Sequence, residues 1–390
     1  MMAQLWNRRW GSLAAASLPL LAACSTPTGT SSGGAVEAAE PLTATVSSPA
    51  PLTSSSGLTT TEPPPTTATS STSTEPERFR LVISAVGDVN VDTDYIPTLR
   101  SEGFEHAFSG LRGAFLDDDL TIVNLECAAT GIGAPTKTRF NFNCDLDALP
   151  VLREAGVEVA NLANNHGADY GLEALLDTKR NVTAAGLVPV GVGRDEVEAH
   201  EPAILTIGGW TIAVLGFNGV MVSEWWAAGP DNAGMADGRV AETMAAAVAA
   251  AEARADLVLV TLHWGFEGDL LPRQNQLDLA DAMIEAGADA IFGHHAHRLQ
   301  PLELVGGVPV AWGLGNFVWP RLSALGARSA IARLTVEPDG TIEACLVPVI
   351  IEGDGHPVIQ DTAPDGSETW CPGAMSIGAE GRSEVAQDPG

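Results

Sequence analysis

Three histidines stand close together in the segment Gly-His-His-Ala-His, directly after an apolar run. They are His294, His295 and His297. Imidazole is a common metal ligand, and alternate residues of an extended segment point to opposite sides. We therefore expect His295 and His297 to bind metal, either by approaching two different ions or by holding one ion from a curved loop. For His294 the sequence favours a structural role, with the ring hydrogen-bonded to the backbone.

Polar residues of the same chemical kind follow four other apolar runs. The segments after those runs contain Gly-Asp, Asn-Leu-Glu, Asn-Asn-His and His-Trp-Gly-x-Glu. Carboxylate, amide oxygen and imidazole together suit Zn, Mn, Fe or Mg better than metals that prefer thiolate. Two such ions would need a bridging carboxylate, and they would activate a hydroxide as a nucleophile near neutral pH. The candidate ligands in these segments are Asp88, Asn90, Glu126, Asn165 and His263.

The apolar runs alternate with helical patterns, which predicts an α/β protein whose strands are buried on both faces. We expect strands over 80–88, 120–126, 157–164, 187–193, 203–209, 210–217, 256–265 and 289–297, and helices over 172–185, 239–254 and 274–287. Two hairpins are expected, one over 302–314 turning at Gly306-Gly307 and one over 329–351 turning at Asp339-Gly340. Ligands of α/β sheets lie beyond the carboxyl ends of the strands, so the polar segments should meet there.

The first residues predict export. Residues 1–23 combine two arginines with an apolar run too short to span a bilayer, which is typical of a signal peptide. Leu-Ala-Ala-Cys resembles a bacterial lipobox and implies cleavage before Cys24 and lipidation of its sulfur; ordinary secretion is the alternative. Residues 24–79 are rich in Ser, Thr and Pro and are interpreted as a disordered tether. The folded domain is expected over 80–352, with a loosely ordered tail over 353–390.

The other four cysteines favour disulfides, because their number is even in an exported chain. Proximity in sequence suggests Cys127–Cys144 and Cys345–Cys371, although three pairings exist and free buried thiols are the alternative. The formal net charge of −29 repels nucleic acid, which we exclude as a partner. It would also repel a polyanionic substrate at long range.

The ordered motifs, continued by Gly-Asn-Phe at 315–317, resemble those of the CapA-type poly-γ-glutamate capsule synthesis proteins, a branch of the calcineurin-like metallophosphoesterase superfamily. The resemblance covers about 80–320. It implies a four-layer α/β/β/α sandwich with two divalent metal ions at the strand ends. It further implies that Asp88 and His297 bind the first ion, that Asn165, His263 and His295 bind the second, and that Glu126 bridges them.

The resemblance also implies roles around the metals. His166 would be a general acid or stabilise the transition state, Glu267 would orient a ligand or contact substrate, and Asn316 would face the same cavity and contact substrate. The sequence departs from the superfamily at Asn90, where a histidine is usual, and at Glu126, where an aspartate is usual. Independently, the pair Trp225-Trp226 is equally compatible with core packing and with a substrate platform beside the site.

Three functions follow as hypotheses. The first is a surface-anchored, metal-dependent hydrolase that attacks a phosphoester or an amide in the synthesis or processing of poly-γ-glutamate or a related envelope polymer. The second is a non-catalytic accessory subunit of a complex that synthesises or exports a capsule polymer. The third is a scaffold or adhesin with a degenerate site.

Overall fold

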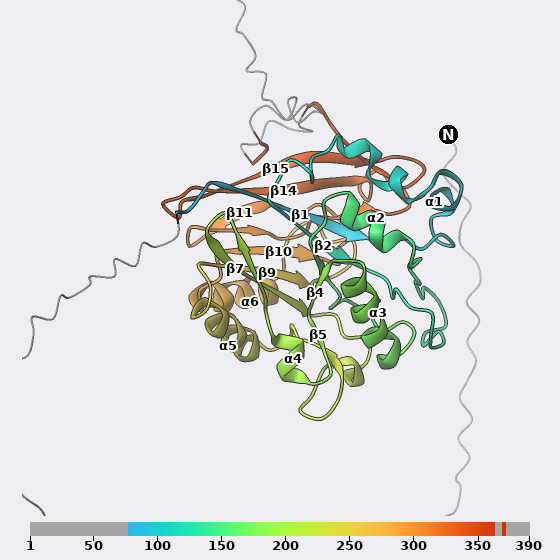
Figure 1. Cartoon of the computed structure of the whole chain (residues 1–390), viewed down its shortest axis with the longest axis horizontal. Coiled ribbons are helices and arrows are strands. Elements are labelled where there is room, and N and C mark those ends of the chain that lie inside the picture. The colour runs from blue at the N-terminus through green and yellow to red at the C-terminus, as the bar shows by residue number, and fades with distance from the viewer. Residues whose placement is uncertain (1–76, 363–368, 372–390) are drawn as a thin grey trace, which may run out of the picture. The chain divides into compact units, whose positions relative to one another are not determined.

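The computed structural model describes residues 77–362 and 369–371 (Figure 1). The predicted signal peptide, Cys24 and nearly all of the predicted tether lie outside these residues, as does most of the predicted tail. Within the described part of the chain, every helix is too short or too polar to cross a membrane.

One mixed sheet has eight strands, in the order β16-β15-β14-β1-β2-β3-β4 with β13 also paired to β1. Strands β1 to β4 and β13 are parallel, whereas β14 to β16 form an antiparallel extension. The strands are β1 (Leu81–Val89), β2 (Leu120–Leu125), β3 (Val159–Asn161), β4 (Val188–Val190), β13 (Asn316–Val318), β14 (Arg328–Val336), β15 (Ile342–Ile351) and β16 (Pro357–Ile359).

A second sheet has six strands, in the order β11-β12-β10-β9-β7-β6. Its four central strands are parallel and its two edge strands are antiparallel. The strands are β6 (Ala203–Ile207), β7 (Trp210–Asn218), β9 (Leu257–His263), β10 (Ala290–His294), β11 (Leu302–Val305) and β12 (Val308–Ala311). A small separate sheet pairs β5 (Val192–Gly193) with β8 (Gly234–Met235).

Three apolar cores separate four layers. The central core lies between the two large sheets and includes Ile83 and Val214. The outer face of the eight-stranded sheet packs on α2 (Ala148–Glu154) and α3 (Leu172–Ala184). The outer face of the six-stranded sheet packs on α5 (Ala241–Glu252) and α6 (Gln274–Glu285), which lie together in Figure 1. Successive residues of a strand face opposite sides, so Val214 and Leu215 enter different cores. The four-layer α/β/β/α sandwich is therefore confirmed.

The predicted strands, three long helices and two hairpins are all present, with shifted ends. The largest change is in the predicted strand 187–193, which breaks at Gly191 into β4 and β5. Gly191 has a φ of 83°, and a Cβ there would lie 2.5 Å from the Cβ of Ala163. The chain can leave the eight-stranded sheet at this point only because residue 191 lacks a side chain.

The folded part extends beyond both predicted limits. Before residue 80, Arg78 forms an ion pair with Asp256 and lies over the ring of Trp210. After residue 352, β16 adds a strand to the edge of β15. A 3-10 helix, η1 (Phe104–Leu111), packs on β16 and was not predicted from the sequence. The tail boundary at 353 is therefore wrong.

Two disulfides join Cys127 to Cys144 and Cys345 to Cys371, which are the pairings suggested by proximity in sequence. The first connects the residue after Glu126 with the segment before α2. The second connects β15 with the short described segment at 369–371, where Trp370 also bridges to Leu346.

Candidate metal centre

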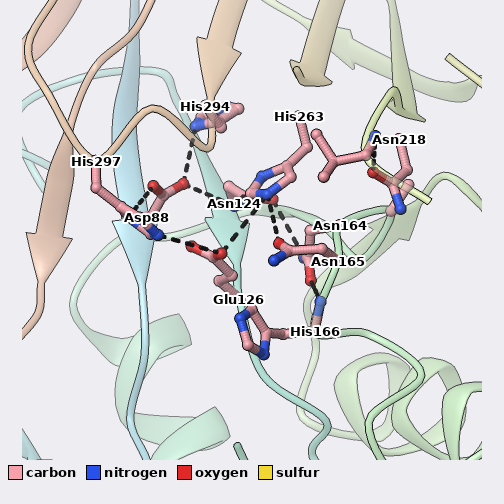
Figure 2. A network of polar contacts seen from close by, with 12 residues as sticks. Asp88, Asn124, Glu126, Asn164, Asn165, His166, Asn218, His263, His294 and His297 are labelled. Atoms are coloured by element: carbon pink, nitrogen blue, oxygen red, sulfur yellow. Dashed lines mark hydrogen bonds and ion pairs between the residues drawn. The ribbon is translucent and has the colours of Figure 1, made fainter. Parts of the chain in front are cut away.

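Two rows of polar residues face each other at the carboxyl ends of the parallel strands. In the eight-stranded sheet, Asp88, Asn124 and Asn161 stand in register on β1, β2 and β3. In the six-stranded sheet, Asn218, His263 and His294 stand in register on β7, β9 and β10. The rows meet across the sandwich (Figure 2), because parallel strands of both sheets end at the same edge.

Two groups of candidate ligands converge between these rows, and Glu126 belongs to both. One group is Asp88, Glu126 and His297; the other is Glu126, His263 and His295. Within each group one ligand atom of every residue lies within 4.8 Å of the others. His263 Nε2 lies 3.6 Å and His297 Nε2 lies 3.9 Å from Glu126 Oε1. Glu126 therefore stands where a carboxylate bridging two ions would have to stand.

The donor atoms fit divalent cations. Both carboxylate oxygens of Glu126 and Nδ1 of His295 are buried without a hydrogen bond. A buried carboxylate without a partner is costly, and a cation is the usual compensation. Oxygen and imidazole donors of this kind suit Zn, Mn, Fe or Mg.

Burial and mutual repulsion set the protonation of this cluster. Burial, with help from Asp88 and Glu267, raises the pKa of Glu126 well above its ordinary value. Burial lowers the pKa of His263 strongly and, together with His297, lowers the pKa of His295 to about 4. These imidazoles are therefore neutral at pH 7, which is the form that binds metal.

The segment that carries His295 and His297 is a tight loop rather than an extended strand. His295 has a φ of 82° and His297 a φ of 49°. A positive φ is uncommon for residues other than glycine and is concentrated at functional sites. Because of this curvature, His295 reaches one ligand group and His297 reaches the other. The sequence left open whether the two histidines approach two different ions or hold one ion from a curved loop. In the structure the loop is curved, and the two histidines belong to different ligand groups.

Asn124 connects the two rows and was not predicted as a site residue. Its amide nitrogen donates to Asp88 Oδ1 at 2.9 Å and lies 3.2 Å from His263 Nδ1. Its amide oxygen accepts hydrogen bonds from Asn161 at 3.1 Å and from Asn164 at 3.3 Å. The sequence did contain a hint of this role, because Asn124 begins the Asn-Leu-Glu segment that also carries Glu126. In the sheet, Asn124 is the register partner of Asp88.

His297 is held by Asn316, which was predicted as a substrate contact. Nδ1 of His297 lies 2.7 Å from Asn316 Oδ1 and 3.1 Å from Asp88 Oδ2. The amide nitrogen of Asn316 donates to the carbonyl of Gly326, so its orientation is fixed. Asn316 therefore positions the histidine ring, although it also lines the neighbouring cavity.

Asn90 was predicted as a ligand and His294 as a structural residue. The amide oxygen of Asn90 accepts a hydrogen bond from the backbone of Asp92 at 2.9 Å, which occupies one of its two lone pairs. Its role as a metal ligand stays a prediction. His294 was expected to bond to the backbone, but its Nε2 instead lies 2.9 Å from the hydroxyl of Thr261.

Asn165 and His166 lie beside the second ligand group. Asn165 Oδ1 accepts a hydrogen bond from His263 Nε2 at 2.7 Å. His166 Nδ1 lies 2.8 Å from Asp169 Oδ2, and the ammonium group of Lys137 lies 2.5 Å from Asp169 Oδ1. Burial lowers the pKa of His166 in spite of Asp169. A buried Lys-Asp-His network thus holds this ring at the edge of the cavity.

A cavity of about 550 Å³ opens next to the ligand groups. His166, His297, Asn316 and the exposed Glu267 line it, together with three cationic side chains: Lys137, Arg139 and Arg298.

The tryptophan pair does not line this cavity. Trp226 is 7% exposed and packs in the core, and the ammonium group of Lys137 lies 6.0 Å from the centroid of its ring. Trp225 is 82% exposed. For Trp226 the structure therefore decides in favour of core packing.

These features define an α/β sandwich with a buried carboxylate-histidine cluster whose donor atoms suit metal binding. Residues 82–321 match the family model for the bacterial capsule synthesis protein PGA_cap, and the chain belongs to this family.

Among its relatives, the chain is 31% identical to the PGA biosynthesis protein CapA of Bacillus subtilis, covering 72% of this chain and 75% of that one. It is 30% identical to the capsule biosynthesis protein CapA of Bacillus anthracis, covering 72% and 70%. A probable polyglutamine synthesis accessory protein of Mycobacterium tuberculosis is 31% identical, over 51% of this chain and 55% of that one.

Two solved structures are similar at lower levels. TT1561 of Thermus thermophilus has a TM-score of 0.39 and 14% identity, covering 68% of this chain and 98% of that one. The 5'-nucleotidase of Candida albicans has a TM-score of 0.41 and 12% identity, covering 72% and 54%.

Proposed function

We propose that this protein acts outside the cell in the synthesis or processing of poly-γ-glutamate or a related anionic envelope polymer. A lipid on Cys24 would hold it on the outer face of the cell membrane, in agreement with the signal-peptide pattern. The names of its Bacillus relatives support the polymer class. The observation that carries the proposal is the convergence of Asp88, Glu126, His263, His295 and His297 beside the cavity.

The charges around the cavity support an anionic substrate. The chain as a whole carries a formal charge of −29, yet Lys137, Arg139 and Arg298 all line this one cavity. The sequence contains two lysines, Lys137 and Lys179, so one of the two lines this cavity. Local cations, and the ions in the centre when bound, would offset the long-range repulsion. A polymer of carboxylates or phosphates is the substrate class that this pattern favours.

The proposed chemistry is hydrolysis of an amide or a phosphoester. Divalent ions, when bound, would polarise the scissile group and lower the pKa of water. Asp88, His297 and Glu126 would hold one ion, and Glu126, His263, His295 and Asn165 the other. With its Nδ1 proton directed at Asp169, His166 would use Nε2 to exchange a proton with the substrate. Glu267, on the rim, would contact the substrate.

The test is an assay of the purified protein, with added Mn²⁺ or Zn²⁺, on γ-glutamyl polymers and on simple phosphodiesters. We expect activity on one of the two classes, and its loss in Glu126→Gln and His297→Ala. Arg139→Gln should raise KM with little change in kcat, because Arg139 is exposed at the cavity and touches no candidate ligand. Arg180→Gln, an exposed arginine outside the cavity, is its matched control.

The second candidate is an accessory subunit that binds polymer without cleaving it. The superfamily histidine is replaced by Asn90, a weaker ligand whose amide oxygen already accepts a hydrogen bond from the backbone of Asp92, which favours this alternative. If the wild type binds metal but cleaves neither substrate class, hydrolysis is excluded. The accessory role then predicts that His297→Ala abolishes polymer in cells although no turnover is measurable in vitro.

A further inference from the structure

A second histidine-carboxylate cluster lies outside the metal centre and shares no residue with it. Its members are His106 on η1, and Asp354 and His356 in the turn between β15 and β16. One ligand atom from each residue lies within 4.8 Å of the others. In the sequence His106 stands about 250 residues before the other two.

The two imidazoles converge on one carboxylate. His106 Nε2 lies 2.8 Å from Asp354 Oδ2, and His356 Nδ1 lies 2.5 Å from Asp354 Oδ1. The ring centroids are 4.4 Å apart. Partial burial acts to raise the pKa of Asp354, but the two histidines outweigh it and lower this pKa to about 2. The carboxylate is therefore ionised at any pH at which the protein is used.

The side chains are partly exposed, at 26% for His106, 34% for Asp354 and 16% for His356. An ion could thus reach them from solvent without unfolding. Two imidazoles and a carboxylate, with a further position open to water, form a ligand set typical of zinc. The donor types also suit other borderline divalent ions, whereas magnesium and calcium prefer oxygen donors only.

The elements that carry the cluster are held together independently of it. A Cβ on Gly110 of η1 would lie 2.3 Å from the carbonyl oxygen of Pro357, so the two backbones are in close contact. Arg112, just after η1, donates to the carbonyl of Ile359 at 3.2 Å and pairs with Asp361. The three side chains are therefore placed in advance, and an ion would not have to order a loop in order to bind.

We propose that His106, Asp354 and His356 form a second, surface site for a zinc-like divalent cation, which clamps η1 to the turn between β15 and β16. The same turn supports the candidate metal centre. The carbonyl of Gly355 accepts a hydrogen bond from the backbone of Trp319 at 3.1 Å, and the Trp319 ring lies 4.8 Å from the His297 ring. An ion in the clamp would stabilise the wall against which His297 packs.

The experiment measures zinc bound to the full chain after chelator treatment and dialysis against micromolar Zn²⁺. Four proteins are compared: the wild type, the clamp variant His106→Gln/His356→Gln, the centre variant Glu126→Gln/His263→Ala, and the control His200→Gln. His200 is a suitable control because it lies outside both clusters and bonds to its own helix. We expect the clamp variant to lose one zinc equivalent relative to wild type, the centre variant to keep that equivalent, and His200→Gln to match wild type.

Thermal melting gives a second readout. In the centre variant, Zn²⁺ should raise Tm, and adding the clamp substitutions should remove this shift. Asp354→Asn, which keeps the side-chain shape but removes the charge and one ligand oxygen, should weaken zinc binding at least about tenfold without loss of the fold. Equal zinc content in wild type and clamp variant, or a Zn²⁺-dependent Tm shift that survives the clamp substitutions, would overturn the proposal. Neither result depends on whether the protein is an enzyme.

Discussion

At the scale of single residues, the metal centre depends on amides that bind no metal themselves. Asn124 fixes Asp88 and His263, and Asn316 fixes His297, so the ligand atoms point into the space around Glu126. Partners of this kind commonly contribute one to two orders of magnitude to metal affinity. Their substitution tests the geometry without removing a ligand.

Asn316→Ala should weaken metal binding at the centre by about 10- to 100-fold, because the His297 ring loses the acceptor that orients it. The measurement is Mn²⁺ or Zn²⁺ affinity by competition with a fluorescent chelator. Asn181→Ala is the matched control, since Asn181 also donates to a backbone carbonyl but lies on α3. An equal loss of affinity in both variants would contradict the positioning role.

The backbone at His295 makes a separate prediction. Its φ of 82° strains any residue with a Cβ, so His295→Gly should be more stable than His295→Ala by about 1 kcal/mol. Both variants lack the imidazole and should lose metal to the same extent. Denaturant unfolding of the two metal-free proteins checks this. If alanine proves as stable as glycine, the loop must relax away from its left-handed conformation.

At the scale of elements, the two disulfides are expected to differ in consequence. Cys127 follows Glu126 directly, whereas Cys345 lies in the middle of β15, away from the ligand groups. A bridge that closes a loop of this length stabilises a protein by about 3 kcal/mol in the chain-entropy model. Both therefore contribute to stability, but only the first lies next to the shared carboxylate.

Replacing Cys127 and Cys144 by alanine should lower both the free energy of unfolding and the affinity for metal. Replacing Cys345 and Cys371 should lower the free energy of unfolding and leave metal affinity within about twofold of wild type. Calorimetric unfolding and metal titration on the two double variants separate these effects. Equal losses of affinity would mean that Glu126 is held by the sheet alone.

At the scale of the whole molecule, stability should depend on pH through Asp118. Burial, opposed by hydrogen bonds and by Arg333, raises the pKa of this carboxyl from its ordinary value of 3.8 to about 7. The folded state therefore holds this proton more tightly than the unfolded state. The resulting stabilisation is complete below about pH 4 and is lost as pH rises through 7.

Asp118→Asn should therefore be more stable than wild type at pH 8, by about 1–3 kcal/mol, and nearly equal to it at pH 4.5. Unfolding in urea at both pH values, with metal-free protein, measures the difference. Asp119→Asn serves as a neighbouring control, because Asp119 accepts a backbone hydrogen bond from Val82 instead. A constant difference between Asp118→Asn and wild type at the two pH values would refute the raised pKa.

Local pattern alone was sufficient for most of the longer strands, for the three longest helices, for the two hairpin turns and for the motifs that carry the donor residues. Hydrophobic periodicity and turn residues are properties of neighbouring positions, so they can be read along the chain. The family resemblance rests on the same motifs. The short helices α1 (Pro97–Glu102), α2, α4 (Glu196–His200), η1 and η2 (Glu224–Trp226) were missed, as were the short strands β8, β13 and β16, because elements of this length give only a weak local signal.

Only the tertiary structure decided which polar residues face one another. Sheet register places Asn124 beside Asp88, and the left-handed loop sends His295 and His297 to different ligand groups. The cluster of His106, Asp354 and His356 exists because β16 returns to the sheet beside η1. Such contacts join residues far apart in the chain, and their geometry is fixed by packing, which no local pattern contains.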